Sequence, residues 1–192
     1  MKIRTHIIII VLMLAINIGK CPAQIHSIDL RSDLPSWILL SPSIGADINW
    51  NQRWSAGISG SYAHWHISGK GHFPRISVAE ATIRRYGEGE AAFKGFYLGA
   101  NIGMQWYDIS PKHHKGWNGN NLAAGVLAGY TLLLPSNWAF DAGLGLGYLY
   151  RDYKRFEWYS PANKDRIINS HKGSAFGITH LSIAVIYRFK CK

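Results

Sequence analysis

The sequence lacks an apolar run long enough to cross a bilayer as a helix. Its longest mostly apolar stretch, Ile7–Ile18, is shorter than the roughly 20 residues that a membrane helix needs. Hydrophobic residues make up 47% of the 192 residues, yet the mean hydropathy is only −0.06. This combination excludes a helical membrane protein and is typical of strands in which apolar and polar positions alternate.

The sequence also has few of the patterns that enzymes and metal sites need. His64 and His66 share a strand face near Ser68, as a lipid A hydrolase on a barrel wall would require, but no acidic residue nearby in sequence could orient either imidazole. His113 and His114 are adjacent, and no second ligand pair has suitable spacing. The sequence therefore predicts no catalytic residues, no metal site and no cofactor. A barrel-borne lipid A hydrolase remains an alternative.

What the sequence does contain is strict alternation over two long segments, 121–134 and 138–150. In each segment every second residue is apolar, and the residues between are mostly glycine or small. Such alternation indicates β-strands, and Pro135-Ser136-Asn137 between them has turn chemistry. One apolar face opposite a glycine-rich, partly polar face is typical of a transmembrane β-barrel, whose strands contact lipid on one side and a crowded interior on the other.

Weaker alternation divides the rest of the chain into strands separated by polar, glycine or proline residues. Residues 75–86 alternate least cleanly and include helix formers, so a helix competes there, but the neighbouring strands favour a strand. The predicted fold class is all-β, an eight-stranded antiparallel up-and-down transmembrane β-barrel. Its predicted strands span 25–34, 43–50, 54–67, 75–86, 95–108, 121–134, 138–150 (extending toward Trp158) and 174–189, with a polar loop at 109–120 and a long loop up to Gly173.

The N-terminus has the features of a cleaved signal peptide, with basic Lys2 and Arg4, an apolar core, and small residues before Gln24. We expect residues 1–23 to form the signal peptide and residues 24–192 the barrel domain. An even number of strands places both ends of the domain on one side, which is expected to be periplasmic. The short turns then face the periplasm and the long loops face outward, so the expected location is the outer membrane of a Gram-negative bacterium.

Charged residues gather on the inward face of the predicted strands. Buried charges must pair, because taking an ion out of water costs several kcal/mol, and the interior of an eight-stranded barrel is just filled by side chains. We therefore predict a salt-bridged network that plugs the lumen, and a small pore lined by the same charges is the alternative. The predicted members are Asp29, Arg31, Asp33, Asp47, Glu80, Arg84, Asp141 and Arg188, and His180 shares their face.

Outward-facing aromatic residues suit the girdles that membrane barrels place at the two lipid interfaces. These are Trp50, Trp54, Phe96, Trp106, Trp138, Tyr148, Tyr150 and Phe189.

The proposed outer loops are basic, which suits anionic neighbours such as lipopolysaccharide phosphates or acidic glycans, although solvated loop charge without a partner explains them equally well. These residues are Lys112, Lys115, Arg151, Lys154, Arg155, Lys164 and Arg166. Nucleic acid is not an expected partner for a surface barrel.

Several short motifs resemble a family of small outer-membrane barrels from Bacteroidetes, the domain of unknown function 3575. The family pattern has a first strand like L-K-T-N-L-L, then P-N-x-G-x-E, r-W-S, R-Y-W, and later G-Y and G-L-G-Y. This sequence differs by Asp33 in place of Asn, Asp47 in place of Glu, and Arg85-Tyr86 in place of Tyr-Trp. The matching segments are 30–34, 42–47, 53–55, 84–86, 129–130 and 145–148.

The resemblance implies an outer-membrane barrel and supplies no catalytic residues. Members of that family often sit near fimbrial or polysaccharide-related genes, which implies a role in the cell envelope. Together with the residue patterns, this predicts a non-enzymatic barrel with a structural or surface-interaction role. The expected partners are outer-membrane lipid and lipopolysaccharide, with envelope or fimbrial proteins as further candidates.

Overall fold

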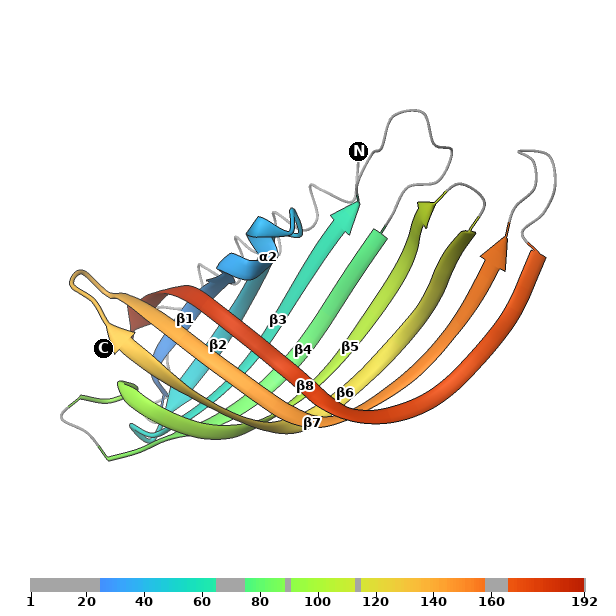
Figure 1. The fold of residues 1–192 in the computed structure, drawn as a ribbon. Coiled ribbons are helices and arrows are strands. Elements are labelled where there is room, and N and C mark those ends of the chain that lie inside the picture. Colours follow the sequence, from blue (N-terminus) through green and yellow to red (C-terminus); the bar gives the residue numbers. More distant parts are fainter. Residues whose placement is uncertain (1–24, 65–74, 89–90, 113–114, 158–165, 192) are drawn as a thin grey trace.

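A computed structural model describes residues 25–64, 75–88, 91–112, 115–157 and 166–191 of the chain (Figure 1). Predictions that concern the signal peptide, His66, Ser68, His113, His114 and Lys164 fall outside these residues. The elements are β1 (Ile25–Asp33), α2 (Leu34–Ile38), β2 (Ser43–Trp50), β3 (Trp54–His64), β4 (Arg75–Tyr86), β5 (Gly95–Lys112), β6 (Lys115–Leu133), β7 (Trp138–Glu157) and β8 (Arg166–Lys190).

The strands form a closed barrel in which each strand pairs antiparallel with the next and β8 pairs with β1. This confirms the predicted fold class, including a strand at 75–86. Ser27 of β1 lies opposite Lys190 of β8, so both ends of the described chain lie at one end of the barrel, here called the terminal end. The other end is called the loop end. Among the described residues, no helix is long and apolar enough to cross a membrane.

Two tight turns stand at the terminal end, and the one between β6 and β7 falls at the predicted Pro135-Ser136-Asn137 segment. The β2–β3 turn contains Asn51 and Gln52 with φ of 49° and 58°, and the β6–β7 turn contains Ser136 and Asn137 with φ of 60° and 68°. Two consecutive positive φ angles are typical of primed hairpin turns, whose twist matches that of the flanking strands. These turns fix the register, so the predicted inward and outward faces are kept along β2, β3, β6 and β7.

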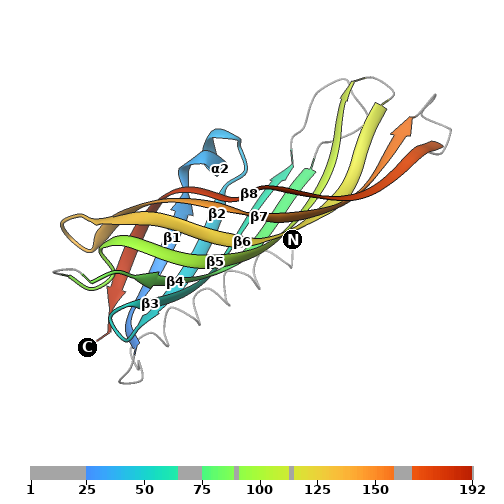
Figure 2. The same ribbon diagram turned by 60° about the horizontal axis from the view of Figure 1, so that its bottom comes forward.

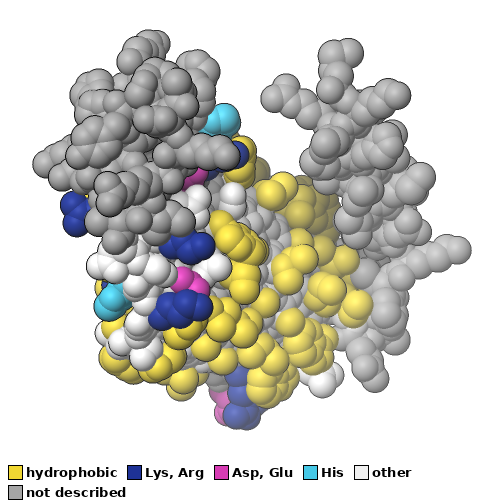
Figure 3. All heavy atoms as spheres, turned by 90° about the vertical axis from the view of Figure 1, so that its right-hand side faces the viewer, with side chains coloured by type: hydrophobic (Ala, Val, Ile, Leu, Met, Phe, Trp, Pro, Cys, Tyr) yellow, Lys and Arg dark blue, Asp and Glu magenta, His cyan; other side chains and the backbone are white. Residues whose placement is uncertain are grey.

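The outer wall of the barrel is apolar and the interior is polar, which reverses the arrangement of a water-soluble protein. Ile44, Ile58, Leu98, Val126 and Leu144 are all exposed on the outside. The buried side chains are largely charged or hydroxylic, and Asp141 and Thr131 are fully buried. Figure 3 shows a broad patch of hydrophobic side chains over the centre and lower part of one face, with charged and other polar side chains along one side of it.

Strands β5, β6 and β8 are longer than predicted, whereas β7 runs to Glu157, in line with its predicted extension toward Trp158. All four strands continue past β1 to β4 at the loop end as a curved sheet (Figures 1 and 2). The prediction of a polar loop at 109–120 is therefore wrong. β5 and β6 stay paired as far as Lys112 and Lys115, and β8 begins at Arg166 rather than at Ser174. The polar composition of these residues predicts a loop. However, paired strands form their backbone hydrogen bonds with each other, whether their side chains contact water or not.

A second correction concerns residues 34–38: Leu34 was predicted to end the first strand and residues 35–38 to lie in the connection to the second, but together they form the short helix α2. Pro35 stands in its first turn, where its missing N–H leaves no helical bond unmade. The exposed side chains of Trp37 and Ile38 place apolar surface beside the barrel wall at the loop end.

The turn between β4 and β5 closes the terminal end of the lumen, which the sequence did not indicate. Phe93 is only 1% exposed, and its φ is 57°. Its ring lies 5.5 Å from the ring of Tyr86 in an edge-to-face arrangement, and it packs in one apolar cluster with Tyr97 and Leu127. This small cluster is the only apolar core among the described residues.

Phe93→Ala should destabilise the barrel by about 3–5 kcal/mol, because it empties a buried aromatic site. Phe96→Ala is the matched control, since Phe96 is 55% exposed on the outer wall three residues away. The measurement is urea unfolding of the barrel in lipid vesicles, read by gel mobility. Equal losses for the two variants would mean that Phe93 does not pack inside the barrel.

Candidate functional site: the charged network of the lumen

Arg31 of β1 is the centre of the largest group of charges in the lumen. Its guanidinium nitrogens lie 3.4 Å from Asp33, 3.6 Å from Asp47 and 3.5 Å from Asp141. It also donates a hydrogen bond of 2.6 Å to the hydroxyl of Ser182, which in turn donates one of 2.6 Å to Asp33. One cation therefore joins β1, β2, β7 and β8 across the barrel.

Arg84 of β4 is the second cation of this group and is 1% exposed. Its Nη1 donates to Oδ2 of Asp47 at 3.4 Å, and its Nη2 donates to Thr82 at 3.3 Å. The guanidinium carbon lies 5.4 Å from the ring centroid of Tyr97, within the range of a cation–π contact. Asp47 thus stands between two arginines, and its charge is compensated from both β1 and β4.

A chain of hydroxyl groups completes the coordination of Asp141. Tyr97 donates to Oδ2 of Asp141 at 3.1 Å, and Thr131 donates to Oδ1 at 2.7 Å. The hydroxyls of Tyr86 and Thr131 are 3.2 Å apart. The sequence prediction considered only charged residues and His180 for the network, so it missed these three hydroxyl groups.

Glycine on the inward face makes room for these side chains. A Cβ built on Gly57 would collide with the carboxylate of Asp47, and one on Gly129 would collide with the phenol of Tyr97. The glycine-rich inner face, first recognised as a barrel signature, is therefore the space that the charged network occupies.

Arg188 and Asp29 form a separate pair nearer the terminal end. Nε of Arg188 lies 2.9 Å from Oδ1 of Asp29, and Nη2 lies 2.7 Å from Oδ2, so the two groups are joined in a fork. The guanidinium carbon of Arg188 is 5.6 Å from the centroid of the Phe93 ring. The pair and the aromatic ring fill the terminal end together.

Glu80 is the predicted member that does not bond to an arginine. Its Oε1 is 2.8 Å from Nδ1 of His180 and accepts a hydrogen bond of 3.1 Å from Asn101. The ladder between β7 and β8 is irregular at Thr179, where Gly145 pairs with His180 and Leu146 with Ile178. This bulge turns Thr179 and His180 toward the lumen in succession, as bulges commonly re-aim side chains.

Above Glu80 and His180 the lumen opens into a cavity of about 460 Å³ toward the loop end. Gln105, Asn121 and Arg151 line it together with these two residues. Asn121 donates to Gln105 at 3.1 Å. The lumen is therefore packed in its terminal half and hollow and polar in its other half.

The predicted aromatic girdle residues all lie on the outward face and fall into two groups. Trp50, Trp54, Phe96, Trp138 and Phe189 stand beside the turns and strand ends of the terminal end. Nearer the loop end, Tyr150 and Met104 both lie opposite Leu122 in the ladders, and Trp106 and Tyr148 are close to that level. Apolar residues fill the strands between the two groups.

The predicted basic residues that the structure describes lie on the strands of the sheet extension rather than in loops. Arg151 and Lys154 are exposed, while the guanidinium carbon of Arg155 lies 5.8 Å from the ring centroid of Trp117. Lys112, Lys115 and Arg166 are at strand ends. Lys172, which pairs with Asp152 at 2.9 Å, adds an ion pair on this surface.

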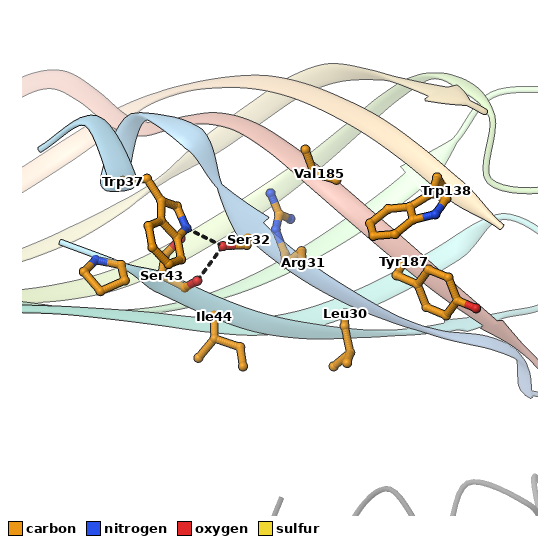
Figure 4. Close-up of a pocket in the computed structure, with 10 residues that line it drawn as sticks. Leu30, Arg31, Ser32, Trp37, Ser43, Ile44, Trp138, Val185 and Tyr187 are labelled. Atoms are coloured by element: carbon orange, nitrogen blue, oxygen red, sulfur yellow. Dashed lines mark hydrogen bonds between the residues drawn. The ribbon is translucent and has the colours of Figure 1, made fainter. Parts of the chain in front are cut away.

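An apolar groove on the outer wall lies where α2 meets the seam between β1 and β8 (Figure 4). Trp37 stands at one end and Trp138 with Tyr187 at the other, and Leu30 and Val185 lie along it. The indole nitrogen of Trp37 donates to Ser32 at 2.8 Å, which holds α2 against the wall. Among the described residues, no group of three or more His, Cys, Asp or Glu side chains could hold a metal ion.

Arg84→Ala should cost about 3 kcal/mol of unfolding free energy, because it leaves Asp47 partly uncompensated in the lumen. Adding Asp47→Ala should restore part of that loss, which a double-mutant cycle in urea would measure.

The control pair is Arg53 and Glu88, which are 2.9 Å apart but 45% and 82% exposed at their side chains. Their coupling should be below about 1 kcal/mol. If the Arg84 and Asp47 cycle is as additive as the control, the lumen charges are hydrated and do not form a packed network.

Comparison with known proteins gives a family and one similar structure. The translocator domain of autotransporter NalP from Neisseria meningitidis superposes with a TM-score of 0.43 and 14% identity, covering 91% of this chain and 66% of that chain. No curated protein matches the sequence. The family described as "Protein of unknown function (DUF3575)" matches residues 6–189. Because this match spans nearly the whole chain, as the sequence motifs predicted, the protein belongs to the DUF3575 family.

Proposed function

We propose that this protein is an outer-membrane barrel of a Gram-negative bacterium with a structural or surface-interaction role, and that it is not an enzyme. The observation that carries the proposal is the inversion of the barrel, with an apolar outer wall around a lumen filled by ion pairs. Water would leave the wall unburied, whereas a bilayer covers it and leaves the charges inside.

The height of the apolar band supports a membrane location. It lies between the two groups of aromatic residues, with Trp138 and Tyr187 paired at the terminal end and Tyr148 and Tyr150 toward the loop end. Aromatic residues collect at the two interfaces of a membrane, where their rings are apolar and their polar atoms reach water. β7 passes through the whole band from Trp138 to Tyr150, a length suited to a tilted membrane strand.

The packing of the lumen supports a plug and argues against a pore. Phe93 and the Arg188–Asp29 pair fill the terminal end, and Arg31 and Arg84 with their carboxylates fill the middle. An ion crossing the barrel would have to break these pairs. The polar cavity at the loop end is thus a recess rather than a channel.

The sheet extension supports contact with the environment outside the membrane. It carries exposed Arg151 and Lys154 on long strands that rise beyond the band. Lipopolysaccharide phosphates and acidic glycans fit such a surface by charge, and envelope or fimbrial proteins are further candidate partners. Nucleic acid is not a proposed partner.

The arrangement around His180 supports the absence of catalysis. Glu80 holds its Nδ1 as an orienting carboxylate would, but Nε2 has no hydrogen-bond partner among the described residues. The nearby hydroxyl of Thr179 donates to Asn101 instead. A nucleophile must be within hydrogen-bond reach of its base, and this cluster offers none.

A cysteine introduced at Ser170 should react with a membrane-impermeant thiol reagent on intact cells, and one at Asn137 should react only after the outer membrane is permeabilised. The two positions lie at the loop end and the terminal end respectively. The unmodified chain provides the background from its own cysteines. Labelling of Asn137 but not Ser170 on intact cells would show that the orientation is reversed.

The purified barrel should show no conductance steps in a planar bilayer, because its lumen is filled. A general diffusion porin, reconstituted in the same way, is the positive control. Steady single-channel currents from the wild-type protein would contradict the plugged lumen and support the alternative of a small pore. Release of acyl chains from lipid A by the same preparation, abolished by His64→Ala, would instead support the hydrolase alternative.

A further inference from the structure

The seam between β8 and β1 closes only part of the barrel. β1 pairs with β8 from Ala184 to Lys190, whereas β7 pairs with β8 along almost its whole length. On its other side, β8 from Arg166 to Ile183 has no neighbouring strand in the part of the chain that the structure describes. The helix α2 contacts β8, but no strand among the described residues pairs with this stretch, so its backbone forms an open sheet edge.

Much of this edge lies at the depth of the apolar band. In the ladder, Leu181 lies opposite Leu144 and Phe176 lies opposite Tyr148. Phe176, Ile178 and Leu181 are 77%, 59% and 63% exposed on the outer wall. The residues paired with β1 fill the terminal half of the band, so the open edge occupies the half nearer the loop end.

Beside the gap, side chains cap the loop-end termini of the β1–β2 pair, whereas the β8 edge has almost no such cap. The backbone N–H of Asp33 donates to the hydroxyl of Ser43 at 2.8 Å, and Ser32 donates to the carbonyl of Ser43 at 2.7 Å. On β8, Asn101 crosses the lumen to donate to the carbonyl of Thr179 at 3.2 Å. No other described side chain bonds to the backbone of β8 between Arg166 and Ile183.

An open strand edge inside a bilayer is costly, because lipid tails offer its N–H and C=O groups no hydrogen bonds. The same row of groups is a template for another extended chain. We propose that an extended segment of a different envelope polypeptide adds to this edge as a ninth strand. The proposal rests on the membrane location given under the proposed function.

The chemistry and geometry of the gap argue against two other occupants, lipid and a second copy of this chain. Lipid covers apolar side chains but leaves the backbone groups unpaired. Two copies inserted into the membrane in the same orientation and facing each other through the same edge are related by a two-fold axis along the membrane normal. With strands tilted by about 35–45°, that axis makes two β8 edges cross at about 70–90°, and they cannot pair.

The site also defines the segment it accepts. Alternate residues should be apolar, to continue the outer wall beside Ile178 and Leu181. The residues between should be small or polar, because they face the lumen beside His180 and Ser182. Lysine or arginine on the lipid-facing positions would be excluded by the cost of charge near the bilayer centre.

Photo-crosslinking in intact cells tests the proposal at two matched positions. A benzoylphenylalanine in place of Phe176 stands on the edge strand, and one in place of Tyr148 stands directly opposite on β7, at the same depth and also exposed. We expect a protein adduct of one discrete mass at position 176 and lipid adducts only at position 148. Lipid adducts only at both positions, an adduct of twice the chain mass, or an internal crosslink would overturn the proposal.

Hydrogen exchange provides the second measurement and does not depend on capturing the partner. Edge amides between positions 174 and 183 should exchange at least tenfold faster in the purified barrel in nanodiscs than in native outer-membrane vesicles. Amides at 184–190, which are paired with β1, should be protected in both. Equal rates at 174–183 in the two preparations would overturn the proposal. Failure of the membrane location itself would appear separately, as the absence of lipid adducts at position 148.

Discussion

The structure depends on one electrostatic requirement. Each charged side chain in the narrow lumen must be paired with an opposite charge or a hydrogen-bonding group within the lumen. Asp47 is shared by Arg31 and Arg84, and Asp141 is held by Arg31, Tyr97 and Thr131. These side chains come from β1, β2, β4, β5, β6 and β7, and Ser182 adds β8. A one-residue slip of any strand would turn its member of the network toward lipid. The network thus fixes the register of the ring as well as filling it.

The apolar wall and the glycine-rich interior follow from the same requirement. Long arginines and a tyrosine can cross the lumen only because Gly57 and Gly129 leave space for Asp47 and Tyr97. Because the polar side chains point into the lumen, the outward positions are apolar. In the proposed membrane location a bilayer covers them. In the proposed membrane location, stability comes from packing polar groups inside the barrel and covering the apolar wall with lipid.

The terminal half of the barrel is closed and packed both in its lumen and in its wall, whereas the half nearer the loop end is open in both. The terminal half has a packed lumen, a closed seam and tight primed turns. The other half has a polar cavity above Glu80 and His180, an open β8 edge and a sheet that extends past the wall. Such a division suits the proposed role, in which one half of the barrel anchors the protein and the other half is available for interaction.

The sequence by itself determined the eight strands, their inward and outward faces, and the membership of the lumen charges, because side-chain direction in a strand follows strict alternation. It could not say which charges meet. Asp47 pairs with Arg84 and Glu80 with His180 because strand tilt and barrel curvature set distances across the lumen. The burial of Phe93 at the terminal end of the lumen could not be predicted, because a residue in a turn belongs to no alternating pattern. The full length of β5, β6 and β8 and the open edge of β8 were likewise decided by the tertiary structure, because a ladder extends wherever a partner strand offers hydrogen bonds and ends where none does.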